Sequence, residues 1–349
     1  MDLFRRLARQ REFMIALVVG LVFLAMCFAS PYFLSSGNLL ALLLGLSVEA
    51  IIAVAMTNLM VAGGFDMSVG SVVAVTGAAT ALLLASEVPV WVSVAVGLAL
   101  GTGVGLFNGL IVSEIGINPF VTTLSSLSLF RGLTLILTRG KNISGLPDGF
   151  KALGQTTVFG VQTPIIIAVV LIAAGDLMLR RFRFFRQSYY IGGNERAARL
   201  SGIPVDRMKT LAYLFTGLFA GLAGVVQTSR LGAASVTAGT GLELRVITAV
   251  IIGGASLQGG EGTVLGAFLG SLLMALITNA LTLLGVDVYW QTFVIGATLL
   301  AAVLVDRLGK TRTSEGQRRT RPALGVSRGE AGGVGSSATA SGQGPPQGP

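Results

Sequence analysis

The stretch PVWVSVAVGLALGTGVGLFNGLIVS, from Pro89 to Ser113, contains no charged residue over its 25 positions. A helix that crosses the hydrocarbon core of a bilayer needs about 20 apolar residues, so this stretch predicts one membrane span. Glycine recurs within it at every fourth position, as Gly97, Gly101, Gly105 and Gly109. On a helix these positions share one face, and a smooth face lets a second helix approach closely in lipid. The stretch therefore predicts a membrane helix that packs through glycine.

Similar apolar runs recur along the chain of 349 residues, of which 52% are hydrophobic and 12% charged. The mean hydropathy of +0.78 lies above the range of soluble domains. The further runs include Phe13 to Ser30, Val69 to Ser86, Thr163 to Gly175, Leu211 to Ser229, Thr263 to Val286 and Val288 to Val305. The fold class predicted from this pattern is an all-α polytopic membrane protein with about ten transmembrane helices.

The composition excludes several classes of function. Histidine is absent and Cys27 is the single cysteine, so the sequence predicts no metal site, no catalytic imidazole and no disulfide within the chain. A membrane-embedded enzyme is therefore disfavoured. The segment LGKT (Leu308–Thr311) resembles the end of a phosphate-binding loop, but Leu304 stands where its first glycine belongs. ATP is not expected to bind this chain.

Basic residues predict the topology. They account for the formal charge of +9, and they gather beside apolar runs, which indicates cytoplasmic segments and no nucleic-acid partner. We expect an N-terminal arm at 1–12, a loop at 181–209 and a disordered tail at 309–349 to be cytoplasmic, with the membrane body at 13–308. Six spans followed by four would satisfy this topology, with both termini inside and the first helix uncleaved. The segment from Arg139 to Gln162 then forms the longest external loop.

A second motif, VAGGFDMSVGSV (Val61–Val72), places Asp66 between two apolar runs. A carboxylate at the centre of a bilayer costs ~3 kcal/mol, so Asp66 should lie near an interface or face a polar cavity. Two interpretations stay open, an ordinary turn in which Asp66 or Ser68 caps the next helix, and a gate of a polar pathway. The candidate pathway residues are Asn58, Gly64, Asp66, Ser68, Thr122 and Asn279. For Asn58, Thr122 and Asn279, a hydrogen bond to a neighbouring helix is the favoured alternative.

The charged stretch GGNERAARLSGIPVDRMK, from Gly192 to Lys209, predicts a helix of about two turns in the loop at 181–209. Asn194 is a suitable N-cap, and Gly202 followed by Pro204 ends the helix. One side carries Glu195, Arg196 and Arg199, and the other carries Ala197, Ala198 and Ser201. The pattern alone leaves two alternatives, a solvated loop helix and a helix that docks in a groove of another protein.

Several of these motifs, together with TAGTGLELRVITAVIIGGASLQGGEGTVLGAFLG and NALTLLGV, resemble the permease subunits of ribose-type bacterial ABC importers for monosaccharides. The resemblance covers about residues 13 to 308 in one order. It implies the importer permease fold in the bacterial inner membrane, contact with membrane lipid, a second permease copy, an extracytoplasmic sugar-binding protein and a separate cytoplasmic ATPase. ATP and Mg would bind the ATPase, so no cofactor is expected here.

The resemblance also assigns a role to the charged stretch, because the loop after the sixth span of these permeases docks on the ATPase. The residues implied for this coupling are Gly193, Asn194, Glu195, Ala197, Ala198, Leu200, Ser201, Gly202 and Ile203. The predicted function is the transmembrane subunit of a monosaccharide importer that alternates its access under ATPase control. The alternative is a self-contained secondary transporter or channel for a small polar solute. That alternative requires paired charges inside the membrane, and the sequence shows few, near span ends.

Overall fold

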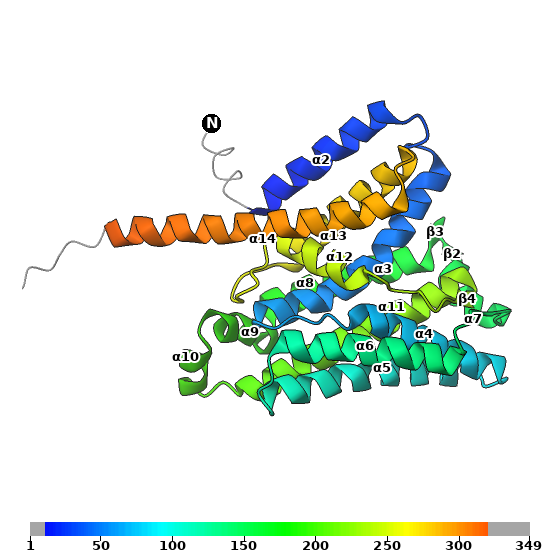
Figure 1. Ribbon diagram of the computed structural model, residues 1–349, viewed down its shortest axis with the longest axis horizontal. Coiled ribbons are helices and arrows are strands. Elements are labelled where there is room, and N and C mark those ends of the chain that lie inside the picture. Colours follow the sequence, from blue (N-terminus) through cyan, green and yellow to red (C-terminus); the bar gives the residue numbers. More distant parts are fainter. Residues whose placement is uncertain (1–10, 320–349) are drawn as a thin grey trace, which may run out of the picture. The chain divides into compact units, whose positions relative to one another are not determined.

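The computed structural model describes residues 11–319, without the side chains of Arg11, Val288 and 305–319 (Figure 1). The predicted arm before residue 11 and the predicted tail beyond residue 319 lie outside the described residues. The chain divides into two units, residues 1–307 and residues 308–349. Within the described residues, the first unit is a bundle of helices.

The chain of the bundle alternates long apolar helices with short connecting elements. In order they are α2 (Arg11–Ala29), α3 (Ser36–Val61), α4 (Val69–Ala85), α5 (Val90–Ser113), α6 (Pro119–Thr138), β1 (Ile143–Ser144), α7 (Asp148–Gln155), β2 (Thr157–Val158), β3 (Val161–Gln162), α8 (Thr163–Arg181), α9 (Arg183–Gly193), α10 (Glu195–Leu200), α11 (Val205–Leu231), β4 (Ala233–Ala234), α12 (Leu242–Ile252), α13 (Val264–Leu283) and α14 (Val288–Arg319).

Among the described residues, seven helices are long and apolar enough to cross a membrane: α2, α3, α5, α6, α8, α11 and α13. The helix α4 and the apolar part of α14 are shorter. With 11 residues, α12 rises only about 17 Å, roughly half of the hydrocarbon thickness. The prediction of a mostly helical, polytopic membrane protein is confirmed, whereas the count of about ten spans stays a prediction.

The segment predicted as the external loop carries regular structure of its own. It contains α7 and three two-residue strands, which form two small antiparallel pairs, β1 with β4 and β2 with β3. The pairing of Ile143 with Ala234 ties this segment to the α11–α12 connection. Over residues 11–319, the fold therefore departs from a purely helical one only in these short pairs.

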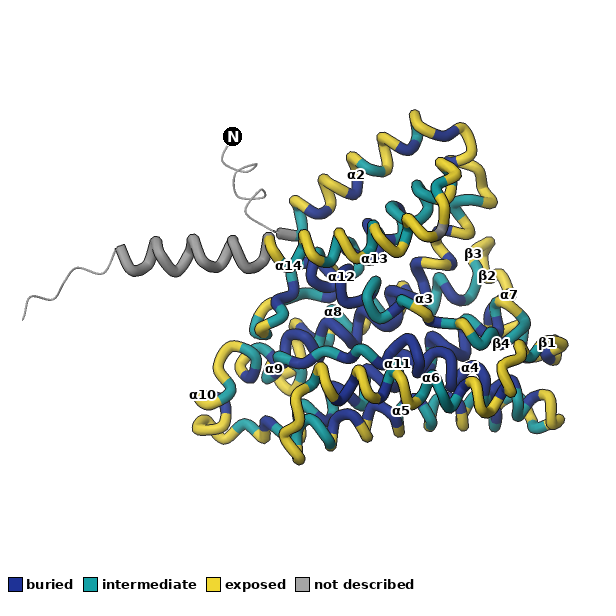
Figure 2. Tube along the Cα trace, in the orientation of Figure 1, coloured by how far each residue is buried: buried dark blue, intermediate teal, exposed yellow. Residues whose placement is uncertain are grey.

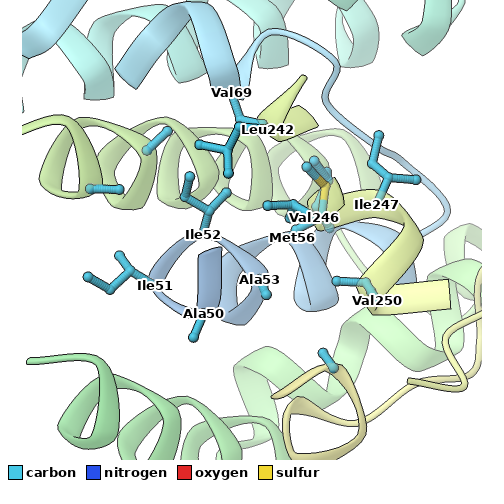
Figure 3. Close-up of a cluster of buried hydrophobic side chains, with 14 of the residues drawn as sticks. Ala50, Ile51, Ile52, Ala53, Met56, Val69, Leu242, Val246, Ile247 and Val250 are labelled. Atoms are coloured by element: carbon cyan, nitrogen blue, oxygen red, sulfur yellow. The ribbon is translucent and has the colours of Figure 1, made fainter. Parts of the chain in front are cut away.

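Two helices form the interior of the bundle. In the most apolar stretch of each helix, 72% of the residues of α3 and 61% of those of α11 are buried. The corresponding share in α2 is 17%. Figure 2 shows this contrast along the trace, and Figure 3 shows the cluster in which Met56 of α3, Val69 of α4 and Val246 of α12 meet. The apolar side chains that α2 exposes suit a lipid environment.

Glycine decides how closely α5 and α11 pack, as the sequence predicts. A Cβ atom added at Gly101 would lie 2.6 Å from the Gly217 carbonyl oxygen, and one added at Gly109 would lie 2.9 Å from Thr210 Cα. Gly105 faces Gly217 in the same way. Because these neighbours are backbone atoms that cannot swing aside, the two helices reach this distance only with glycine at the contact.

A second glycine contact joins α12 to α13. A Cβ atom at Gly270 would lie 2.8 Å from the carbonyl carbon of Ala249, and Gly266 meets the backbone of Gly253. The close contact between α12 and α13 therefore also depends on glycine.

The basic residues of the loop at 181–209 lie at one end of the bundle, whereas Arg139, Lys141 and Lys151 lie beside α7 and the strand pairs. Figure 1 shows α9 and α10 at this end, opposite α7 and the strand pairs. Glu12, at the start of α2, accepts a hydrogen bond of 2.6 Å from Thr263 and lies 3.9 Å from Arg180. The grouping agrees with the predicted placement of these segments on one membrane face, which we call the basic end.

We expect Gly101→Ala to lower the free energy of unfolding by about 1–3 kcal/mol, because the new methyl group overlaps the α11 backbone. The matched control is Gly103→Ala, because a Cβ atom there meets nothing within 4 Å. That variant should be neutral or more stable by up to about 1 kcal/mol, since alanine favours a helix. Thermal unfolding of the purified chain in detergent measures both. Equal midpoints for the two variants would contradict the glycine contact.

Candidate functional site

A polar cavity opens between α3, α11, α12 and α13. Its polar lining comes from eight side chains: Asn38, Glu49, Gln227, Arg230, Arg245, Thr278, Asn279 and Thr282. Asn38 lies in the first turn of α3, and Arg230 lies in the last turn of α11. Both positions are far along the chain from the basic end, so the cavity occupies the opposite half of the bundle and reaches inward to Glu49.

Two asparagine amides close one side of the cavity. Asn38 donates to the Asn279 side-chain oxygen at 3.2 Å, and Asn279 donates back to the Asn38 oxygen at 2.7 Å. Asn38 also donates to the Phe33 carbonyl at 2.9 Å. The pair joins α3 to α13 and places Asn279, one of the predicted pathway residues, on the cavity surface.

A charged pair lies deeper in the same cavity. The Glu49 carboxylate stands 2.6 Å from the Arg245 guanidinium, and Glu49 is 8% exposed. Glu49 occupies the middle of the 26-residue helix α3, where an unpaired carboxylate would cost about 3 kcal/mol. The pair therefore offsets the burial of each charge.

This pair corrects the expectation that charges inside the membrane lie only near span ends. Sequence reasoning missed Glu49, although a signal was present, because it is the single charged residue between Phe13 and Phe65. Its partner, Arg245, follows it by almost two hundred positions and could not be assigned without the fold.

Asp66 lies outside the cavity, at the break between α3 and α4. Its carboxylate accepts bonds from the Ser68 amide at 2.7 Å and the Ser68 hydroxyl at 2.6 Å. Asn108 of α5 donates to the Ser68 hydroxyl at 2.9 Å, and Ser126 of α6 donates to Asn108 at 2.5 Å. Asp66 is 1% exposed. We call Asp66, Ser68, Asn108 and Ser126 the aspartate network, and it ties the start of α4 to α5 and α6.

The geometry of this network agrees with the interpretation of Asp66 as a turn residue at the start of α4. The carboxylate stabilises the start of α4 through the Ser68 amide, whereas Ser68 makes no capping bond of its own with its side chain. None of the four residues of the aspartate network lines the cavity described above. Whether the break also gates a pathway stays a prediction.

The other predicted pathway residues are dispersed. Asn58 accepts a hydrogen bond of 2.9 Å from Ser188 of α9. Gly64 lies against Leu59 and Tyr213, and the Thr122 hydroxyl is buried without a hydrogen-bond partner among the described residues. The cavity lining includes none of these three residues. Of the six predicted residues, the structure brings only Asn279 to the cavity.

The charged stretch forms the predicted short helix, α10. The Asn194 side chain accepts from the Ala197 amide at 3.0 Å, which is the expected N-cap. Arg199 pairs with Glu195 at 3.0 Å, and Lys209 pairs with Glu195 at 2.6 Å. The hydrogen bond from Lys209 lowers the pKa of the Glu195 carboxyl below its ordinary value. Glu195 is therefore ionised at neutral pH and joins α10 to the start of α11.

The predicted small-residue face of α10 is divided. Ala198 is only 4% exposed and packs against Ile191, Val205 and Met208 of the same chain, because α11 turns back against α10. Ala197 and Ser201 remain exposed beside a groove between α9 and α10. Leu200 is 91% exposed at the tip. The surface available to a partner therefore centres on Ala197, Leu200 and Ser201, and Ala198 serves the loop's own core.

The described residues contain no group of three or more acidic, histidine or cysteine side chains able to hold a metal ion. The polar chemistry of the cavity is instead that of amides, guanidinium groups and a carboxylate. Such groups donate and accept hydrogen bonds with neutral polar molecules.

Comparison with known proteins identifies similar chains. A family profile described as the permease component of branched-chain amino acid transport systems matches residues 38–303. The ribose import permease protein of Escherichia coli (strain K12) is 42% identical over 281 residues, which cover 79% of this chain and 88% of that protein. No solved structure gives a match.

Further relatives carry other sugar names. The ribose import permease protein of Bacillus subtilis (strain 168) is 39% identical over 80% of this chain and 87% of its own. The L-arabinose transport system permease protein of Escherichia coli (strain K12) is 36% identical, over 83% of this chain and 88% of its own.

We expect Asp66→Ala to lower the free energy of unfolding by about 3 kcal/mol, because hydrogen bonds to a buried carboxylate are among the stronger ones. Asp148→Ala serves as the control, since the Asp148 side chain is 97% exposed beside Lys151. Its loss should change stability by less than about 0.5 kcal/mol. Thermal unfolding in detergent compares the two. A network variant as stable as the control would show that the aspartate network is dispensable.

Proposed function

Because the chain belongs to this permease family, and within it to the permeases of ribose-type ABC importers, we propose that it translocates a monosaccharide across the bacterial inner membrane. The extent of similarity to the ribose import permeases carries this proposal. The cavity supports it, because amide, guanidinium and carboxylate groups are the partners that sugar hydroxyls use. Ribose, arabinose and related sugars are the substrates to test first.

The partners follow from the family. An ABC importer permease works with an ATPase and a substrate-binding protein, so ATP and Mg belong to the ATPase and we propose no cofactor on this chain. We propose that the ATPase docks on α10 and the groove beside it, through Ala197, Leu200 and Ser201 in particular. The position of Leu200 supports this site, because it places an exposed apolar side chain at the tip of a short charged helix, beside the groove.

The helix α11 offers a mechanical route from this docking surface to the cavity. It begins at Val205, directly after α10, and its last two turns present Gln227 and Arg230 to the cavity. The ion pairs of Glu195 with Lys209 and of Arg199 with Asp206 fix α10 to the start of α11. Closure of the ATPase would thus displace α11 as a rigid element and change access to the cavity, a population shift between packed states.

We further propose the complete topology. The helices α2, α3, α4, α5, α6 and α8 would cross before the loop at 181–209, and α11, α12, α13 and α14 after it. Because α12 is short, the connection from β4 onward would complete its crossing. This arrangement keeps both termini in the cytoplasm. The exposed apolar faces would contact membrane lipid, and a second copy of the permease would complete the importer.

One observation favours the alternative of a secondary transporter, namely the Glu49–Arg245 pair inside the bundle. Ion-coupled carriers use buried titratable pairs as relays. Uptake of the solute into liposomes that contain this chain alone, driven by an ion gradient, would support the alternative. Uptake that requires the ATPase, the binding protein and ATP would support the importer.

We expect Leu200→Asp to abolish co-purification of the ATPase and to reduce ATP-dependent sugar uptake at least about tenfold, because a charge replaces the apolar tip of the contact. Leu284→Asp is the control, since Leu284 is also exposed, at 54%, but ends α13 far from the basic end. That variant should retain the ATPase. Normal ATPase binding by the Leu200 variant would contradict the docking site while leaving the transport function open to the uptake assay.

A further inference from the structure

We propose that Glu49, Gln227 and Arg230 form the hydroxyl-binding site of the cavity and select a neutral polyhydroxylated substrate. This inference rests on the proposed function and deepens it, because it names the side chains that meet the substrate. The three residues come from α3 and from the end of α11, and all line the same cavity.

Two acceptor atoms of this site have no partner. The second oxygen of Glu49, Oε2, and the amide oxygen of Gln227, Oε1, are buried and accept no hydrogen bond from any described residue. Buried polar atoms in folded proteins are nearly always paired, and those that are not need a specific explanation. A ligand that brings O–H donors into the cavity supplies the missing partners.

The two asparagine amides of the cavity behave differently, which argues against a purely structural role for these two acceptors. Asn38 and Asn279 satisfy one another, as a pair that only joins helices should. Glu49 uses its first oxygen, Oε1, to hold Arg245, while its second oxygen is buried without a partner among the described residues. The unpaired acceptors are therefore confined to one part of the cavity, between the middle of α3 and the end of α11.

Arg230 completes the site with a donor. Gln227 and Arg230 are three residues apart on α11 and share one face of the helix. No ion pair among the described residues holds the Arg230 guanidinium, whereas Arg245 is neutralised by Glu49. A sugar hydroxyl can accept from Arg230 and donate to Glu49 or Gln227 at the same time, so neighbouring hydroxyls match an alternation of donors and acceptors.

The same arrangement disfavours acidic substrates. A carboxylate or phosphate would find one free guanidinium, but it has no proton to donate to Gln227 and would be repelled by Glu49. A neutral polyol satisfies all three groups. Selection against charge therefore rests on acceptors that only hydroxyl or amine donors can use.

The test is uptake by the reconstituted importer of permease, ATPase and binding protein, with ribose and each monodeoxyribose as substrates. The binding protein is saturated with each sugar in turn, so that its own affinity does not enter the comparison. We expect the unsubstituted complex to transport at least one deoxy analogue about tenfold more slowly than ribose, because its missing hydroxyl leaves an acceptor unpaired. In Gln227→Leu that difference should disappear while ribose uptake falls about tenfold.

Two further variants keep the test decisive. Gln187→Leu makes the same change on α9, outside the cavity lining, and should leave ribose uptake and the ratio between sugars unchanged. If Gln227→Leu fails to assemble with the ATPase, Arg230→Gln takes its place. That change removes the guanidinium and should likewise reduce the preference for ribose over one analogue.

Three results would overturn the inference. If a cavity variant takes up every sugar more slowly by the same factor, these side chains have a structural role only. An unchanged preference would remove them from the substrate contact, and faster uptake of an aldonate than of ribose by the unsubstituted complex would contradict selection of neutral substrates. Absence of ATP-dependent uptake of every sugar by the unsubstituted complex would instead contradict the proposed function, and this inference with it.

Discussion

The close contact between α5 and α11 is the constraint on which the rest of the bundle depends. Lipid tails are as apolar as leucine, so burial of apolar side chains does little to bring one membrane helix to another. Glycine at positions 101, 105 and 217 removes the side chains that would hold the backbones apart. Because α11 is held against α5 in this way, it acts as one rigid element. Its first turn follows α10, and its last turns line the cavity.

The polar groups of the bundle fall into two kinds. The aspartate network is closed, since each member donates to or accepts from another and together they hold the break before α4. The cavity is open in the chemical sense, since Glu49 and Gln227 keep acceptor atoms without partners. The first kind stabilises a fold in a medium that cannot solvate polar groups, and the second is what a transported solute requires.

Local features of the fold could be predicted from the sequence, and features that depend on which helices meet could not. The spans, the glycine face of α5 and the Asn194 cap are encoded within a few turns of chain. The partner of Glu49 and the burial of Ala198 depend on contacts with distant or returning segments. Asp66 was selected as a candidate because it lies in a glycine-rich break. Glu49 is the stronger candidate, because it is a charged residue within an unbroken apolar helix.

We propose that the cavity alternates between the two sides of the membrane under control of the ATPase. Cys27 is the single cysteine, so Cys27→Ser provides a background in which Asn279→Cys reports on the cavity alone. In the reconstituted importer, the rate at which a membrane-impermeant maleimide labels this cysteine should change at least about tenfold between the nucleotide-free state and the state trapped with ATP. Labelling from one side at the same rate in both states would contradict the account.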